Sequence, residues 1–134
     1  MVTDARNLDN FFSFDKILLD APCSGSGTID ANTDFSKTFT QTLIKKSVSS
    51  QTALLSKAIK LLKPGKEMVY STCSILECEN EGVISKILSK AKAEIVPIEL
   101  EGVPLLPSKI KGTLCIAPTA LYEGFFVAKI RKVG

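Results

Sequence analysis

The sequence has 134 residues, the length of a single domain, and its 45% hydrophobic and 23% charged residues are ordinary for a globular protein. This balance argues against a disordered chain, and the absence of histidine excludes catalysis by a Ser-His or Cys-His pair within the chain. The formal net charge of +3 permits a polyanionic partner without requiring one.

The first half of the chain predicts a strand, a loop and a helix. An apolar run at 16–20, closed by Asp20, is typical of a short strand buried on both faces. Residues 24–34 are rich in turn-forming residues and predict a loop. Apolar residues near helical spacing predict a helix over 43–63, which the following Pro-Gly pair ends.

The second half predicts a strand, a helix and two further strands. Residues 67–72 form a second apolar run, and Ser74 and Glu77 then have the spacing of a capping box, which predicts the start of a helix. The strand predicted over 93–100 contains a proline, which places it at a sheet edge. Alternating apolar residues predict a final strand over 123–133.

The order of these elements indicates an α/β fold. It is typical of a sheet that is mostly parallel and ends in an antiparallel C-terminal strand. No G-x-G-x-x-G turn opens a strand–helix unit, and no lysine of a phosphate-binding loop follows the short Gly-Ser-Gly stretch at 25–27.

Two cysteines follow the ends of predicted strands. Cys23 and Cys73 each lie one to three residues beyond such an end. In open α/β sheets, sites form where the carboxyl ends of strands meet their loops, so neighbouring strands would turn both thiols toward one crevice. A thiol just ahead of a helix N-terminus also feels the positive end of the helix, which favours the nucleophilic thiolate. Free cysteine is nevertheless often a small buried apolar residue, the class expected for Cys78 and Cys115.

The cysteines and the N-terminus also bear on metals and on the compartment. No C-x-x-C pair is present, which together with the lack of histidine argues against a zinc site, so no metal is expected. The N-terminal residues contain no long apolar run, so neither a signal peptide nor a membrane span is expected. Free thiols in a reducing compartment, the cytoplasm, are the expected state.

The segments around Cys23 and Cys73 resemble a known enzyme family. DAPCSGSGT at 20–28, followed by LKPGKEMVYSTCSILECENE at 62–81, is similar to the DAPCSG and TCS motifs of the Nol/Nop/Sun family of 5-methylcytosine RNA methyltransferases, which includes Fmu- and RsmB-like enzymes. EGFFVAKIRK near the C-terminus resembles the last strand of the family, and TDAR near the N-terminus resembles its acidic cofactor motif. The resemblance covers nearly the whole chain.

The resemblance implies a partial Rossmann-like methyltransferase fold that uses S-adenosylmethionine to methylate carbon 5 of a cytosine in ribosomal or transfer RNA. By the same resemblance Cys73 is the nucleophile that adds to carbon 6, Cys23 assists release of the product, and Asp20 hydrogen-bonds the base. The transient thiol bond makes carbon 5 reactive. Asp4, Asp20 and Pro22 would contact the cofactor. The target cytosine is expected to be unpaired or flipped, because it must enter the crevice.

The matched motifs belong to the C-terminal half of the family's catalytic domain. Family members place their glycine-containing cofactor loop upstream of these motifs, so residues 1–134 are expected to lack the first cofactor-binding strands. The strand at 16–20 would then have an unpaired edge, which invites self-association or pairing with an N-terminal partner. We expect the isolated chain to be marginally stable and to transfer methyl groups weakly or not at all.

Two rival interpretations stay open. A non-catalytic remnant would keep the methyltransferase fold and bind RNA or a protein partner. A thiol redox or metal-binding domain would use Cys23 and Cys73, although the cysteine spacing argues against it. The lysines flanking the predicted 43–63 helix and those near the end of the chain are typical of solvated faces, with phosphate contact as the alternative.

Overall fold

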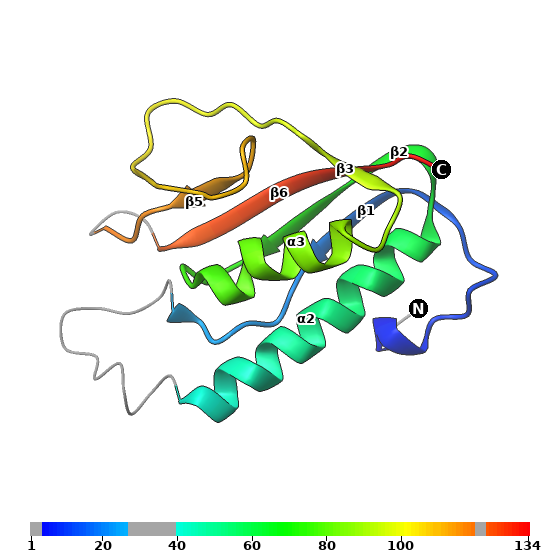
Figure 1. Cartoon of the computed structure of the whole chain (residues 1–134), viewed down its shortest axis with the longest axis horizontal. Helices are drawn as coiled ribbons and strands as arrows, with labels where there is room; N and C mark the ends of the chain where they lie inside the picture. The colour runs from blue at the N-terminus through cyan, green and yellow to red at the C-terminus, as the bar shows by residue number, and fades with distance from the viewer. Residues whose placement is uncertain (1–3, 27–39, 120–122) are drawn as a thin grey trace.

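The computed structural model describes residues 4–26, 40–119 and 123–134, so most of the loop predicted over 24–34 lies outside the described residues. The elements in chain order are the 3₁₀ helix η1 (Ala5–Asn7), β1 (Phe14–Asp20), α2 (Gln41–Leu61), β2 (Leu62–Thr72), the 3₁₀ helix η3 (Glu77–Glu79), α3 (Glu81–Leu88), β3 (Ala93–Val96), β4 (Leu105–Leu106), β5 (Leu114–Ile116) and β6 (Phe125–Lys132). Figure 1 shows their arrangement.

The described strands form one mixed sheet in the order β1-β2-β6-β5-β4, with β3 also paired to β6. The α/β class is confirmed, and β1, β2 and β3 run in one direction while β6 runs against them. The C-terminal strand nevertheless lies between β2 and β3 rather than at an edge. Counted by pairs, the described sheet is therefore mostly antiparallel, with β1–β2 as its parallel pair. The inner position of β6 follows from its apolar face, because Phe126, Ala128 and Ile130 are all fully buried.

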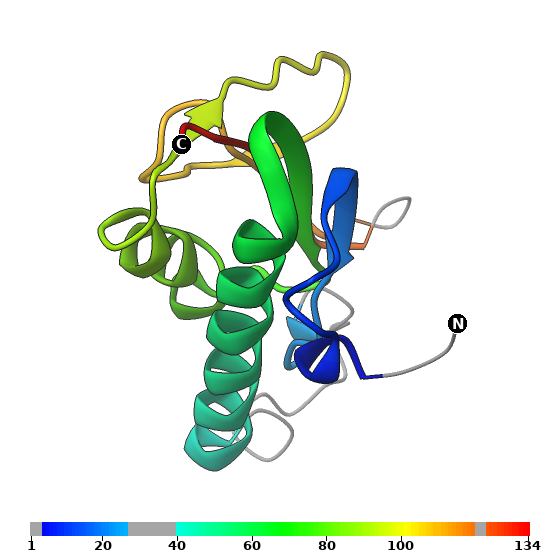
Figure 2. The ribbon, with the colours of Figure 1, turned by 90° about the vertical axis from the view of Figure 1, so that its right-hand side faces the viewer.

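Both α-helices cover the same face of the sheet (Figures 1 and 2). α2 begins after Thr40, whose Oγ1 accepts a hydrogen bond from the Leu43 N–H at 3.2 Å. It ends before Pro64, and Gly65 then adopts a left-handed φ of +79° where the register between β1 and β2 shifts. None of the helices in the described ranges is long and apolar enough to cross a membrane.

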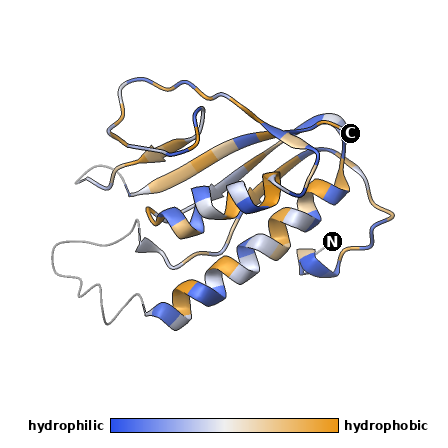
Figure 3. Ribbon diagram, viewed as in Figure 1, coloured by the Kyte–Doolittle hydropathy of each residue, from blue (hydrophilic) through white to orange (hydrophobic). Residues whose placement is uncertain are grey.

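The core fills the space between this sheet face and the two helices. In Figure 3 the ribbon of α2 alternates between apolar and polar segments, as expected of a helix with one buried side. The strand register places apolar side chains of β1, β2 and β6 side by side, opposite the apolar faces of α2 and α3. The buried or partly buried side chains at this contact include Ile17, Leu19, Met68, Tyr70, Ala128 and Ile130 from the sheet and Leu55, Ile59, Val83, Ile84 and Ile87 from the helices.

The prediction that the first strand is buried on both faces is wrong. Leu18 is 74% exposed, whereas its neighbours Ile17 and Leu19 pack against the core. Successive side chains of a strand point to opposite faces, and the described helices cover only one face of the sheet. β1 is also the terminal strand of the described sheet, so Leu18 lies on an open face beside an open edge.

The capping box predicted at Ser74 and Glu77 does not form. The Ser74 hydroxyl donates to the Glu79 carboxylate at 2.8 Å, and Glu77 lies at the surface in an ion pair with Lys109 at 3.0 Å. α3 starts only at Glu81, after η3. The local pattern assigned the Ser74 hydroxyl to a helix N-terminus, but this hydroxyl donates its hydrogen bond to the buried Glu79 carboxylate instead.

The strand predicted over 93–100 is shorter than expected. β3 ends at Val96, directly before Pro97, whose missing N–H cannot extend the ladder. In the described part of the chain β3 pairs with β6 alone, which agrees with the predicted edge position.

Candidate active site

β1 and β2 end side by side at one edge of the sheet. Their parallel register pairs Asp20 with Ser71, and the Ser71 hydroxyl donates to Asp20 Oδ1 at 3.2 Å. The pairing continues at Ala21, whose N–H donates to the Ser71 carbonyl at 2.8 Å. Asp20 remains exposed, so its carboxylate is open to a ligand. The loops that carry Cys23 and Cys73 leave the sheet from this same edge.

The two thiols at this edge are neighbours. Backbone hydrogen bonds from Gly25 and Cys73 reach the Cys23 sulfur, and the Asp20 charge acts on both thiols. Both cysteines are partly buried and both are free thiols. The edge thus combines a carboxylate with two thiols, and a thiol is a group that can act as a nucleophile or transfer a proton. The roles assigned to these three side chains stay predictions.

The surroundings of both thiols favour the neutral form in the free protein. Partial burial raises the pKa of Cys73, and the nearby Cys23 and Asp20 raise it further. Burial also raises the pKa of Cys23, against the two backbone hydrogen bonds, which lower it. The expected help from a helix N-terminus is absent because α3 begins only at Glu81, and the helix dipole acts within about one turn.

Alkylation of Cys73 by iodoacetamide should reach half its maximal rate above the ~pH 8.5 of an unperturbed thiol. Replacing Asp20 with asparagine removes a negative charge, lowers the pKa of Cys73 and should speed its alkylation at neutral pH. Peptide mass spectrometry after timed labelling measures each cysteine separately. Glu99→Gln, at an exposed acid, is the matched control and should leave the rate unchanged. An unchanged or slower rate in Asp20→Asn contradicts the assigned electrostatics.

A carboxylate that the sequence analysis did not single out links the two thiol-bearing loops. Glu79 is fully buried. Its Oε2 accepts the Ser24 N–H at 2.7 Å, and its Oε1 accepts the hydroxyls of Ser24 at 2.5 Å and Ser74 at 2.8 Å. Ser24 follows Cys23 and Ser74 follows Cys73, so one carboxylate holds the residue after each thiol. Because Glu79 accepts hydrogen bonds from the residue that follows each thiol, it is the main tie between the loops.

Further hydrogen bonds join the same two loops. Ser26 Oγ bonds Ser74 Oγ at 3.0 Å and accepts the Ile75 N–H at 3.0 Å. The Thr72 hydroxyl donates to Asn80 Oδ1 at 2.6 Å, and Asn80 Nδ2 donates to the Ser74 carbonyl at 2.9 Å. A buried network of this kind fixes the relative position of its members.

Gln51 extends the network to Pro22 from α2. Its side chain is fully buried, and Nε2 donates to the Pro22 carbonyl at 2.8 Å and to Glu79 Oε2 at 3.3 Å. Its buried Oε1 finds no partner among the described residues. A glutamine on the apolar stripe of α2, between Val48 and Leu55, was a sequence signal for this network.

Asp4, one of the predicted cofactor contacts, makes no hydrogen bond or ion pair with the thiol loops within the described residues. Its carboxylate accepts the Arg6 N–H at 2.9 Å as the cap of η1 and pairs with the Arg6 guanidinium at 2.6 Å. The hydrogen bonds from Arg6 hold the pKa of Asp4 at about 2. Asp4 therefore stays a prediction separate from the cluster around Asp20.

The other two cysteines differ from each other. Cys115 is buried in β5, as predicted, and burial raises its pKa to about 11. Cys78 is exposed, which corrects the prediction of a buried apolar role, because η3 turns it toward the helices rather than the core. The described residues contain no group of three side chains able to hold a metal ion.

Comparison with known proteins gives consistent matches. The family model described as 16S rRNA methyltransferase RsmB/F matches residues 1–131. The chain is 41% identical over 130 residues to the ribosomal RNA small subunit methyltransferase F of Shewanella piezotolerans, which covers 92% of this chain and 27% of that protein. It is 36% identical over 134 residues to a tRNA (cytosine(49)-C(5))-methyltransferase of Pyrococcus abyssi, which covers 90% of this chain and 42% of that protein.

Solved structures agree with these matches. The structure of NSun6 from Pyrococcus horikoshii with SFG has a TM-score of 0.83 at 33% identity, over 100% of this chain and 34% of that one. A methyltransferase homolog from Pyrococcus horikoshii has a TM-score of 0.76 at 41% identity, over 92% of this chain and 40% of that one. The Rossmann-like methyltransferase fold is thereby confirmed, for a chain that spans about a quarter of the length of the Shewanella relative.

Proposed function

The chain belongs to the 16S rRNA methyltransferase RsmB/F family, and from that premise we propose that it carries the thiol-bearing part of an RNA methyltransferase acting on carbon 5 of cytosine. Ribosomal or transfer RNA is the proposed substrate, because similar proteins are named for each. Residues 1–134 form the C-terminal part of the catalytic domain in this proposal, and the cytoplasm is the proposed compartment.

Cys73 is the proposed nucleophile. Its thiolate adds to carbon 6 of the cytosine, which turns carbon 5 into an enamine-like centre able to accept a methyl group. After the carbon 5–methyl bond forms, carbon 5 loses its proton and the sulfur–carbon 6 bond breaks, which regenerates the thiolate. Cys23 is the proposed acceptor of that proton, a role that requires its thiolate and that its position beside Cys73 supports.

Asp20 is the proposed contact to the base. Its exposed carboxyl group is positioned by the Ser71 hydroxyl and hydrogen-bonds the cytosine near its ring nitrogen. Attack by the thiolate puts negative charge on the ring, so in this role the Asp20 carboxyl group carries a proton and donates it to the ring nitrogen. A paired base cannot reach an edge of this kind, so the proposal requires an unpaired or flipped cytosine.

S-adenosylmethionine is the proposed cofactor, and when bound it supplies an electrophilic methyl group on a positively charged sulfur. The residues at the end of β1 fit such a group, because Asp20 offers an exposed carboxylate and Pro22 is exposed beside it. Gln51 holds the Pro22 carbonyl and so keeps this loop in place. Asp4 is the proposed contact to the adenine side.

The single observation that carries the proposal is that β1 and β2 end side by side and that Glu79 bonds both Ser24 and Ser74, so the loops of Cys23 and Cys73 are held together beside Asp20. The test uses the protein in its full natural length, S-adenosylmethionine, and RNA tritiated at carbon 5 of cytosine. Methyl incorporation should release tritium to water in equal amount, because carbon 5 loses its hydrogen. Methyl incorporation without tritium release would assign a different target atom.

The alternative function is a non-catalytic remnant that binds RNA or protein. The raised pKa values of both thiols favour it, because they reduce the thiolate fraction at neutral pH. A protein that still binds RNA but shows no methyl incorporation and no tritium release would be such a non-catalytic remnant.

We also propose that the open face at β1 is covered by another part of the protein or by a second copy. Leu18 on β1, the terminal strand of the described sheet, is 74% exposed, and Phe11, which precedes β1, is 88% exposed. Sedimentation of residues 1–134 should show association that Leu18→Glu reduces at least about threefold, because a charge then opposes burial. Leu100→Glu, at an exposed loop leucine, should leave association unchanged. A dilute, sharply melting monomer contradicts this proposal.

A further inference from the structure

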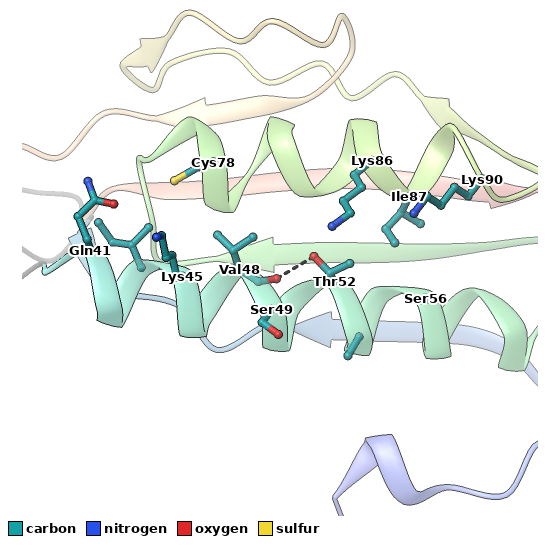
Figure 4. A pocket seen from close by; sticks show the side chains of 12 residues that line it. Gln41, Lys45, Val48, Ser49, Thr52, Ser56, Cys78, Lys86, Ile87 and Lys90 are labelled. Atoms are coloured by element: carbon teal, nitrogen blue, oxygen red, sulfur yellow. Dashed lines mark hydrogen bonds between the residues drawn. The ribbon is translucent and has the colours of Figure 1, made fainter.

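A groove runs between α2 and α3 on the outer side of the helical layer. Two hollows of about 720 Å³ and 300 Å³ form it, and they are continuous because Ser56, Ile87 and Lys90 line both. Figure 4 shows the larger hollow, with Lys86 and Ile87 of α3 pointing toward α2. Partly buried apolar side chains such as Val48 and Ile44 form its floor.

The charged side chains that line this groove are all positive. The lysines that line it are Lys45, Lys60, Lys86, Lys90, Lys92 and Lys132, and no Asp or Glu side chain lines either hollow. Within the described residues none of these lysines pairs with a carboxylate, whereas Lys63, Lys109 and Lys129 all do. Uncompensated lysines gathered along one groove favour an anionic occupant.

The composition of the groove distinguishes between anionic partners. Besides the lysines, its polar side chains are Gln41, Ser49, Thr52 and Ser56, and it contains neither an arginine nor an aromatic residue. Protein–protein interfaces are depleted in Lys and Ser and enriched in Arg and aromatic residues. Lys, Ser, Thr and Gln side chains are, in contrast, the usual partners of nucleic-acid phosphates.

We propose that this groove, the α2–α3 lysine groove, binds the phosphate backbone of the RNA substrate next to the cytosine that enters the thiol site. The inference rests on the proposed function for the identity of the RNA. The groove starts at Gln41 and Cys78, one residue before Glu79, and so adjoins the thiol loops. From Gln41 to Lys60 it follows α2 for about 29 Å at 1.5 Å per residue, which is long enough for several nucleotides. Its phosphate contacts hold the strand in position and read no sequence.

The test measures binding of a fluorescein-labelled single-stranded RNA to the protein in its full natural length over a series of salt concentrations. Lys86→Gln/Lys90→Gln should weaken binding about tenfold and reduce the slope of log affinity against log salt by about 1.4, because each lost contact to a single strand contributes about 0.7. Lys66→Gln/Lys111→Gln removes the same charge from exposed lysines outside the groove and should change neither quantity.

Equal RNA binding by the groove and control variants overturns the proposal. So does a groove variant that keeps its RNA affinity but loses binding of a fluorescein-labelled polyglutamate peptide, because the occupant is then an acidic protein segment. In the tritium-release assay the groove variant should raise KM and leave kcat unchanged. If wild-type protein releases no tritium while the groove still governs RNA binding, the proposed chemistry fails and the groove assignment stands.

Discussion

Replacing Cys23 with alanine is expected to make the full-length protein accumulate a covalent adduct between Cys73 and its RNA substrate. In the proposed reaction Cys73 forms the bond to carbon 6, and the neighbouring Cys23 removes the carbon 5 proton that allows that bond to break. Without Cys23 the first half of the reaction proceeds and the second stalls. Incubation with S-adenosylmethionine and RNA, followed by denaturing electrophoresis, should show a slower band that ribonuclease removes.

The matched variants make this result specific. Cys73→Ala should lower methyl transfer by about 10³-fold or more, because the covalent route is lost, and should form no adduct. Cys23→Ala/Cys73→Ala should also form none, and Glu99→Gln, at an exposed acid outside the cluster and the groove, should behave as wild type. An adduct that persists in Cys73→Ala would assign the nucleophile to another residue.

Replacing Glu79 with alanine is expected to lower the free energy of unfolding by about 3 kcal/mol, because several buried or partly buried donors then lose an acceptor. Those donors are the Ser24 N–H, the Ser24 and Ser74 hydroxyls and one N–H of Gln51. Glu79→Gln keeps the size but turns an amide donor toward other donors, so it should cost about half as much. Urea unfolding measures both effects.

The control and the functional readout separate a positioning role from a purely structural one. Glu77→Ala removes an exposed carboxylate two positions away, whose pair with Lys109 is solvent-exposed, and should cost less than about 0.5 kcal/mol. At temperatures where the Glu79→Gln variant stays folded, the misalignment of its two thiols should lower kcat by a larger factor than it raises KM. Equal stability of the Glu77 and Glu79 variants would show that the network is not the main tie between the loops.

Local periodicity predicted much of the framework. β1, β2 and β6 lie where apolar runs or alternation placed them, and the helix predicted over 43–63 is α2 at Gln41–Leu61. These elements depend on residues close together in the sequence, whose apolar side chains repeat every 2 or 3.6 positions. They can therefore be predicted from one amino-acid sequence. The cysteines after β1 and β2 could be located for the same reason, since parallel strands end at a common edge.

Features that depend on distant partners could not be predicted. Whether Leu18 is buried depends on which face the helices cover, and whether Ser74 caps a helix depends on a buried carboxylate nearby. Glu79 lies in a run of acids that looks solvated in the sequence, yet it is fully buried. Its partner Ser24 is distant along the chain and meets it only after the sheet has formed.

The sequence by itself determined the fold class, the resemblance to RNA methyltransferases and the positions of both thiols relative to strand ends, because each follows from short-range pattern or motif. Only the tertiary structure decided that β6 lies inside the sheet, that the surroundings of both thiols favour their neutral form, that Glu79 joins their loops and that lysines without a carboxylate partner line one groove. The physical reason is that burial and pairing arise between segments far apart in the chain, and these set the charge state and position of a side chain more strongly than its neighbours in sequence do.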